Sequence, residues 1–223
     1  MPRISEKIES VQTRLAEVAQ HNQVPLLLAV SKTRTEKEVR EATACGLLNF
    51  GENYLQDAIA KIEALDDLNI IWHFIGSIQS NKTSDIAKHF NWVHTVDRLK
   101  IARRLSEQRP ESMSDLNILI QLNIDDEDSK GGIAPAELMG LAAKLVALPK
   151  VKLRGLMAIP APRTKFEEQL AVCEKIHNYY LQLQQQYPEV DTLSMGMSAD
   201  LEAATKAGSN LVRIGTDIFG PRQ

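Results

Sequence analysis

The chain has 223 residues, of which 43% are hydrophobic and 25% charged, and a formal net charge of −3 at pH 7. These values are ordinary for a globular protein with a substantial core, and the charge gives no basic patch of the kind that binds nucleic acid or an anionic membrane. The two cysteines are far apart, the N-terminus lacks the apolar core of a signal peptide and no apolar run reaches membrane length, so we expect a cytoplasmic protein without a disulfide framework or zinc site.

The chain begins with an amphipathic pattern and then alternates between short β-rich runs and longer helical ones. Apolar residues at helical spacing from Ile4 to Val18 predict an N-terminal helix within residues 1–22, and Pro25 marks the break after it. The β-rich runs predict strands near residues 26–31, 47–50, 70–75, 91–95, 116–123, 152–157, 191–195 and 211–215. Helices are expected near residues 35–45, 53–65, 80–89, 98–108, 135–147, 164–186 and 199–207.

Eight strands separated by helices predict a parallel sheet with crossover helices. The count of eight, at about 25–30 residues per unit, favours a closed barrel over an open doubly wound sheet. No linker rich in Pro, Gly or Ser divides the chain. The sequence therefore predicts an α/β protein, a single-domain (β/α)8 TIM barrel over residues 26–220 with an extra N-terminal helix, so that residues 1–223 form one domain.

Lys32 follows the first predicted strand and shares its inward face with Leu28 and Val30. An ammonium group in apolar surroundings is costly, and lysine readily loses its proton when it is desolvated. The neutral amine is the form that makes Schiff bases with aldehydes. The alternative for Lys32 alone is an amine that reaches solvent from the end of the strand.

Three more polar residues, Asn53, His73 and Asn123, follow or end predicted strands. Functional groups of such barrels collect at the carboxyl ends of the strands. For His73 a hydrogen bond inside the core is favoured over a role as a metal ligand, and the spacing of the histidines predicts no metal site.

The last two strands end in segments typical of anion binding. Ser198 is placed to cap the helix 199–207, Gly208 follows that helix, and Gly196 allows the backbone to approach a ligand closely. Strand eight ends in Arg213-Ile214-Gly215-Thr216, where parity points Arg213 into the barrel. The alternative to anion binding is that Ser198 only caps its helix and that Arg213 pairs with a buried acid. Together with Lys32, these groups suit an aldehyde that carries a phosphate, which describes pyridoxal 5′-phosphate (PLP).

Six stretches carry a wider likeness: LAVSKT at 28–33, FGENY at 50–54, WHFIG at 72–76, LMAIP at 156–160, LSMGMS at 193–198 and VRIGT at 212–216. In these stretches the chain resembles the PLP homeostasis proteins, relatives of the barrel domain of alanine racemase (fold-type III). The resemblance implies that Lys32 carries PLP as an internal aldimine and that Arg213 faces the pyridine nitrogen. It also implies that Ser198, Gly215 and Thr216, with the backbone near Met197, hold the phosphate, and that Asn53 is a further contact. One departure is Gly131, where the family usually has serine, and it leaves open the conformation of the 124–134 loop and the role of Lys130 there.

The resemblance also bears on activity. Arginine cannot accept the proton that a pyridinium would donate, so Arg213 would weaken the cofactor as an electron sink. Racemisation needs acid and base groups on both faces of the substrate, and in alanine racemase one comes from a second domain. The chain ends at Gln223, seven residues after Thr216, so we expect that domain to be absent.

The sequence therefore predicts a PLP-binding protein that acts in cofactor homeostasis or delivery, with little or no turnover. Its expected partners are PLP and PLP-dependent apo-enzymes, and its expected state is a monomer or weak dimer. A single-domain PLP-dependent amino-acid racemase is the first alternative. A barrel that serves only as an interaction scaffold is the second.

Two other segments resemble binding motifs. The segment 76–83 is close to a P-loop, with Asn81 at the second glycine position, and the segment 126–137 is close to a calcium loop, with Lys130 at a ligand position. The tight backbone wrap of a P-loop is usually glycine's task, and an ammonium cannot coordinate calcium. We expect neither a nucleotide nor a metal at these segments.

Overall fold

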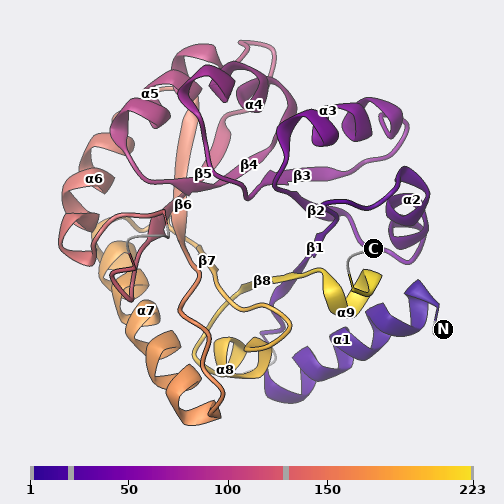
Figure 1. The fold of residues 1–223 in the computed structure, drawn as a ribbon. Helices are drawn as coiled ribbons and strands as arrows, with labels where there is room; N and C mark the ends of the chain where they lie inside the picture. The colour runs from indigo at the N-terminus through magenta and orange to yellow at the C-terminus, as the bar shows by residue number, and fades with distance from the viewer. Residues whose placement is uncertain (1–2, 20–22, 128–130, 222–223) are drawn as a thin grey trace.

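The structure, a computed structural model, describes residues 3–19, 23–127 and 131–221. Eight parallel strands, hydrogen-bonded in chain order, close into a barrel in which the first strand pairs with the last (Figure 1). The strands are β1 Leu26–Val30, β2 Asn49–Glu52, β3 Ile71–Phe74, β4 Trp92–Val96, β5 Leu116–Leu122, β6 Val151–Ala158, β7 Thr192–Ser194 and β8 Leu211–Ile214. The predicted (β/α)8 barrel is confirmed, and all eight strands lie where the β-rich runs placed them.

Helices surround the barrel. They are α1 Ile4–Val18, α2 Glu36–Ala44, α3 Leu55–Ala64, α4 Thr83–His89, α5 Leu99–Gln108, α6 Leu138–Leu145, α7 Phe166–Gln186, α8 Leu201–Lys206 and α9 Thr216–Phe219. Short 3₁₀ turns, Ser80–Lys82 and Pro135–Glu137, precede α4 and α6. The sequence did not predict α9, because one turn of helix is too short to show a hydrophobic period. None of the helices in these ranges combines the length and apolar content needed to cross a lipid bilayer.

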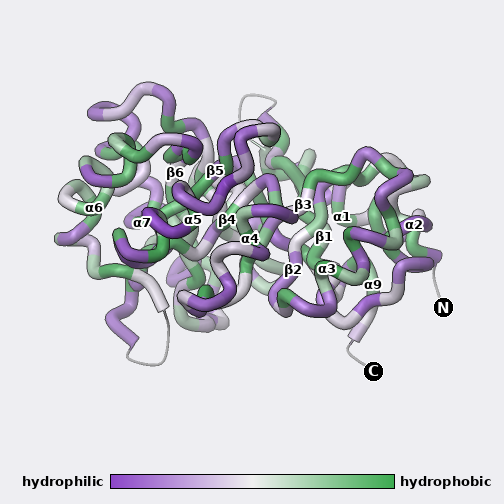
Figure 2. The backbone as a smooth tube through the Cα atoms, turned by 90° about the horizontal axis from the view of Figure 1, so that it is seen from above, coloured by the Kyte–Doolittle hydropathy of each residue, from purple (hydrophilic) through white to green (hydrophobic). Residues whose placement is uncertain are grey.

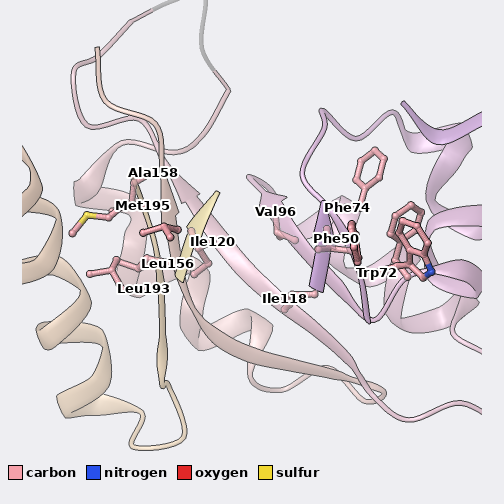
Figure 3. Packing of buried hydrophobic residues seen from close by; sticks show 14 of the residues in the cluster. Phe50, Trp72, Phe74, Val96, Ile118, Ile120, Leu156, Ala158, Leu193 and Met195 are labelled. Atoms are coloured by element: carbon pink, nitrogen blue, oxygen red, sulfur yellow. The ribbon is translucent and has the colours of Figure 1, made fainter. Parts of the chain in front are cut away.

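The main core lies between the strands and the helices. Phe50, Trp72 and Phe74 come from neighbouring strands and gather on one side of the barrel (Figure 3). The ring centroids of Phe50 and Trp72 lie 5.9 Å apart, and Phe74 meets Phe90 edge to face at 5.2 Å. Along the surrounding helices polar and apolar residues alternate, as expected for elements that bury one face (Figure 2). Burying each large apolar side chain contributes roughly 1.5–3 kcal/mol.

Helix α1 packs on the outside of the barrel against α8 and α9 (Figure 1). Its buried residues are Ile8, Val11 and Leu15, which the helical period places on one face. The N-terminal helix therefore covers the elements that follow β7 and β8.

Candidate functional site

A cavity of about 310 Å³ opens at the carboxyl ends of the strands. It brings together the seven residues expected to contact the cofactor: Lys32, Asn53, Met197, Ser198, Arg213, Gly215 and Thr216. The remaining lining residues are Val30, Arg34, Ile75, Met157, Ile159 and Ala199. Arg34 was not among the expected site residues, because it lies in a turn and has no strand parity to place it.

Lys32 lies just beyond β1, in a turn that aims it into the cavity. The Ser31 amide donates to the Gly51 carbonyl (3.0 Å), which extends the β1–β2 pairing by one residue. The chain then reverses, and the Arg34 amide donates back to the Ser31 carbonyl (3.0 Å). Thr33, in this turn, has φ +62°, a conformation that costs a β-branched residue roughly 1–3 kcal/mol. The strain marks a local geometry that the surrounding contacts impose.

A buried ion pair lies behind this turn, on the helix side of the strands. Glu52 Oε1 accepts from the Ser31 hydroxyl (2.6 Å) and from Lys61 Nζ of α3 (2.5 Å). Lys61 Nζ also donates to the Ser31 carbonyl (2.8 Å), and the side chains of Glu52 and Lys61 are 0% and 6% exposed. The pair fixes the residue that precedes Lys32.

Arg213 lies on the inside of the barrel, as strand parity predicts, and is 5% exposed. Its Nη1 donates to the carbonyl (2.8 Å) and hydroxyl (2.7 Å) of Ser194, and its Nη2 donates to the carbonyl of Ala158 (3.0 Å). These acceptors are neutral, so the alternative of pairing with a buried acid is wrong. Burial lowers the pKa of Arg213 to about 10, which leaves the guanidinium charged at neutral pH.

A chain of buried polar side chains continues from Arg213 across the barrel interior. The Ser194 hydroxyl lies 3.1 Å from His94 Nδ1, His94 Nε2 lies 2.9 Å from His73 Nδ1, and His73 Nε2 lies 3.0 Å from Asn49 Oδ1. The expected core hydrogen bond of His73 is confirmed. The role of His94 was missed, although strand parity and a histidine on the neighbouring strand were signals for it.

The direction of donation along these hydrogen-bonded side chains follows from the groups at the two ends. An arginine can only donate, so the Ser194 oxygen accepts from Arg213 and its hydrogen is free to point at His94 Nδ1. Each histidine then carries its proton on Nε2, and the last hydrogen bond of the row is accepted by the side-chain Oδ1 of Asn49. Both histidines are neutral, and burial lowers the pKa of His73 to about 3 and that of His94 well below its ordinary value.

The two loops that follow β7 and β8 differ in part from expectation. Helix α8 begins at Leu201, and Asp200 is its N-cap residue, so the prediction that Ser198 caps this helix is wrong. The Asp200 carboxylate instead accepts from the Met197 amide (2.7 Å), which places Ser198 in the tight turn before the helix. Gly208 follows the helix with φ +95°, as expected.

Glycines allow close packing at two places around the cavity. Gly196 has φ +97°, and a Cβ there would lie 2.7 Å from that of Ala204. A Cβ at Gly76 would lie 2.1 Å from the carbonyl oxygen of Asn53. Gly76, the first residue of the segment that is close to a P-loop, therefore packs directly on the backbone that presents Asn53.

Asn123 does not line the cavity. Asn123 Nδ2 donates to the Glu127 carbonyl (3.0 Å) and Asn123 Oδ1 accepts from the Glu127 amide (3.1 Å), so it organises its own loop. Lys130, part of the 124–134 loop, lies outside the described residues. Within the described ranges no group of three or more His, Cys, Asp or Glu side chains could hold a metal ion.

Comparisons with known proteins place the chain in a family. The family model "Alanine racemase, N-terminal domain" matches residues 7–223. The pyridoxal phosphate homeostasis protein of Escherichia coli strain K12 is 48% identical and that of Pseudomonas aeruginosa strain PAO1 is 52% identical. The alignments cover 100% of this chain and 95% and 97% of those proteins.

Comparison with solved structures agrees with this family assignment. PipY from Synechococcus elongatus PCC7942 with PLP bound is 35% identical with a TM-score of 0.85, over 98% of this chain and 100% of that one. Alanine racemase from Corynebacterium glutamicum, at 16% identity and a TM-score of 0.71 over 97% of this chain and 60% of that one, shares the fold. The chain therefore belongs to the pyridoxal phosphate homeostasis protein family, whose barrel is that of the alanine racemase N-terminal domain.

Proposed function

We propose that this chain binds PLP covalently through Lys32 and acts in PLP homeostasis by holding the cofactor and handing it to apo-enzymes. The observation that carries the proposal is the convergence of one strand-end amine, two hydroxyl- and amide-bearing loops and a buried arginine on a single small cavity. Its volume of about 310 Å³ suits a small organic ligand. The names of the curated relatives and the PLP bound to PipY support the same assignment.

The residues of the cavity fit this cofactor. Asn53 lines the cavity, and its buried Oδ1 has no hydrogen-bond partner among the described residues, so a rotation of this side-chain amide would offer an acceptor to a ligand hydroxyl. Ser198 and Thr216 bring hydroxyls to the wall formed by the loops after β7 and β8, where Gly215 and the Met197–Ser198 backbone add peptide groups. Arg213, fixed by Ser194 and Ala158, supplies a cation that cannot accept a proton.

Each residue then has a definite role. When bound, the cofactor supplies an aldehyde on an electron-withdrawing ring. Lys32 would attach it through Nζ, while Ser198, Gly215 and Thr216 would bind its phosphate oxygens. Arg213 would face the ring nitrogen and keep it unprotonated, which lowers the reactivity of the bound cofactor toward amino acids.

The composition of the cavity favours holding the cofactor over turnover. Among the described residues that line it, Lys32 is the only amine, and histidine, tyrosine, cysteine and carboxylates do not occur there. Racemisation requires an acid and a base on opposite faces of the substrate carbon. One amine on one wall does not provide both.

Spectroscopic titration with PLP tests the proposal. The wild-type protein is expected to develop the visible absorbance of a Schiff base, and borohydride reduction followed by peptide mass spectrometry is expected to place the cofactor on Lys32. Lys32→Ala should abolish the band. Lys37→Ala is the matched control, because Lys37 lies on the exposed face of α2 and does not line this cavity.

Three results would contradict the proposal. One is a covalent adduct that persists in Lys32→Ala, and another is sustained racemisation of alanine or serine by the wild-type protein. The third concerns delivery. The loaded protein should reactivate a PLP-dependent apo-enzyme, and loaded protein reduced with borohydride should not, so equal reactivation by both would rule out transfer from Lys32.

A further inference from the structure

Arg14, a partly buried residue of α1, contacts both segments, after β7 and β8, that form the proposed phosphate-binding wall of the cavity. Its Nε donates to Glu202 Oε1 (2.8 Å) at the start of α8, and its Nη1 donates to Asp217 Oδ2 (2.7 Å) at the start of α9. Its Nη2 lies 3.5 Å from the carbonyl oxygen of Ser198. Arg14 does not line the cavity, so it reaches these segments from behind.

Acidic residues are concentrated behind this wall. Asp200 and Glu202 begin α8, and Asp217 directly follows Thr216. Acids at these positions suit the first turns of helices, but each also places a negative charge near Ser198 and Thr216, the residues proposed to bind phosphate. Charges within a Debye length of about 10 Å influence one another, so these carboxylates oppose a bound dianion.

Two of the three carboxylates are paired with Arg14. The side chains of Arg14, Glu202 and Asp217 are 33%, 38% and 26% exposed, so their charges are only partly screened by solvent. Asp200 is engaged differently, by the Met197 amide. Lys7 lies in the same groove as Arg14 on α1, but it makes neither of these two contacts.

We propose that Arg14 is a positioning residue for the phosphate group. The guanidinium of Arg14 offsets the charges of Glu202 and Asp217 and so allows the Ser198 and Thr216 loops to accept a dianion. This inference rests on the proposed function, because it assumes that those loops bind the phosphate of PLP. It assigns to the N-terminal helix a part in selecting phosphorylated pyridoxal over pyridoxal.

The test compares PLP with unphosphorylated pyridoxal in titrations of the visible band. Arg14→Gln is expected to weaken PLP binding about fivefold, the size of one partly exposed ion pair, and to change pyridoxal binding by less than about twofold. Lys7→Gln removes the same charge from the same groove and should change neither affinity. Raising the salt concentration should reduce the difference between wild type and Arg14→Gln.

Removing the acids separates charge compensation from a structural role. Glu202→Gln/Asp217→Asn, with Arg14 retained, should bind PLP at least as tightly as the wild type, and adding Arg14→Gln to that pair should leave affinity within about twofold of wild type. Equal weakening of PLP and pyridoxal by Arg14→Gln would overturn the inference, and so would weaker PLP binding by the Glu202→Gln/Asp217→Asn variant. A wild-type protein that binds neither ligand would instead overturn the proposed function.

Discussion

Asn53 shows a conflict between stability and binding within one side chain. Its Oδ1 is buried without a partner among the described residues, and such a group costs roughly 1–3 kcal/mol of stability. Gly76 packs on the Asn53 backbone so closely that no other residue fits, which holds the side chain at the cavity. A group kept in place at such a cost is expected to gain its partner from a ligand.

Asn53→Ala is therefore expected to have opposite effects on the two properties. The free energy of unfolding of the protein without PLP should stay constant or rise by up to about 1 kcal/mol, because an unsatisfied acceptor is removed. The affinity for PLP should fall about tenfold, the value of one lost hydrogen bond to a ligand. Urea denaturation and absorbance titration measure the two effects.

Asn123→Ala is the matched control. Its oxygen and nitrogen are both satisfied by Glu127, so the alanine variant should lose about 1 kcal/mol of stability and keep its PLP affinity. If Asn53→Ala instead lost stability and kept its affinity, Asn53 would be a structural residue.

At the scale of elements, the ends of β1 and β2 are joined to α3 by Ser31, Glu52 and Lys61. Two charges are buried there, and their desolvation offsets most of their attraction, so the pair itself adds little stability. Removing one partner is different, because the other charge stays buried alone. The arrangement specifies where β1 ends, and therefore where Lys32 begins its turn.

Lys61→Met is expected to destabilise the protein by about 3–5 kcal/mol, because Glu52 would be left buried without its cation. Glu52→Gln combined with Lys61→Met should recover a substantial part of that loss, since both charges are then gone. Urea denaturation of the wild type, Lys61→Met, Glu52→Gln and the double variant measures the coupling. Additive losses in the double variant would show that the two side chains do not act as a pair.

At the scale of the whole molecule, the barrel could be predicted because its signals are periodic. Each β-rich run, such as 26–31, is short and flanked by a helical pattern, and strand parity correctly turned Lys32 and Arg213 inward. Ser198 and Thr216 were predicted from the loops that end the last two strands, and the resemblance added the backbone near Met197.

The features that could not be predicted are contacts between side chains that are far apart in the sequence and that the fold brings together. Arg14 contacts Asp217, which is 203 positions away along the chain, and His94 contacts Ser194 across 100 positions. No local pattern contains such pairs. The wrong cap at Ser198 has a local cause, because Ser198 and Asp200 are both favourable caps and the sequence does not choose between them.

The buried histidines should make the stability of the whole barrel depend on pH. Their chain runs from Asn49 on β2 through β3, β4 and β7 to Arg213 on β8, so protonating a member disturbs most of the barrel interior. Burial lowers the pKa of His73 to about 3, from an ordinary value of 6.5 that applies to the unfolded chain. Between these values the unfolded chain binds the proton and the folded protein does not, so stability is fully present above pH 6.5 and is lost as the pH falls.

Each histidine should contribute about 1.4 kcal/mol of lost stability for each pH unit below its unfolded pKa, or about 2.7 kcal/mol for the two together. Urea unfolding at several values between about pH 7 and 5 measures this slope. His94→Gln removes one of the two titrating groups, so its slope should be shallower than the wild-type slope by about one proton. His177→Gln is the control, because His177 does not belong to this row of hydrogen-bonded side chains and is less buried than His73 and His94. Its variant should keep most of the wild-type slope. If His94→Gln and the wild type lost stability in parallel, the buried histidines would not be the groups that take up the protons.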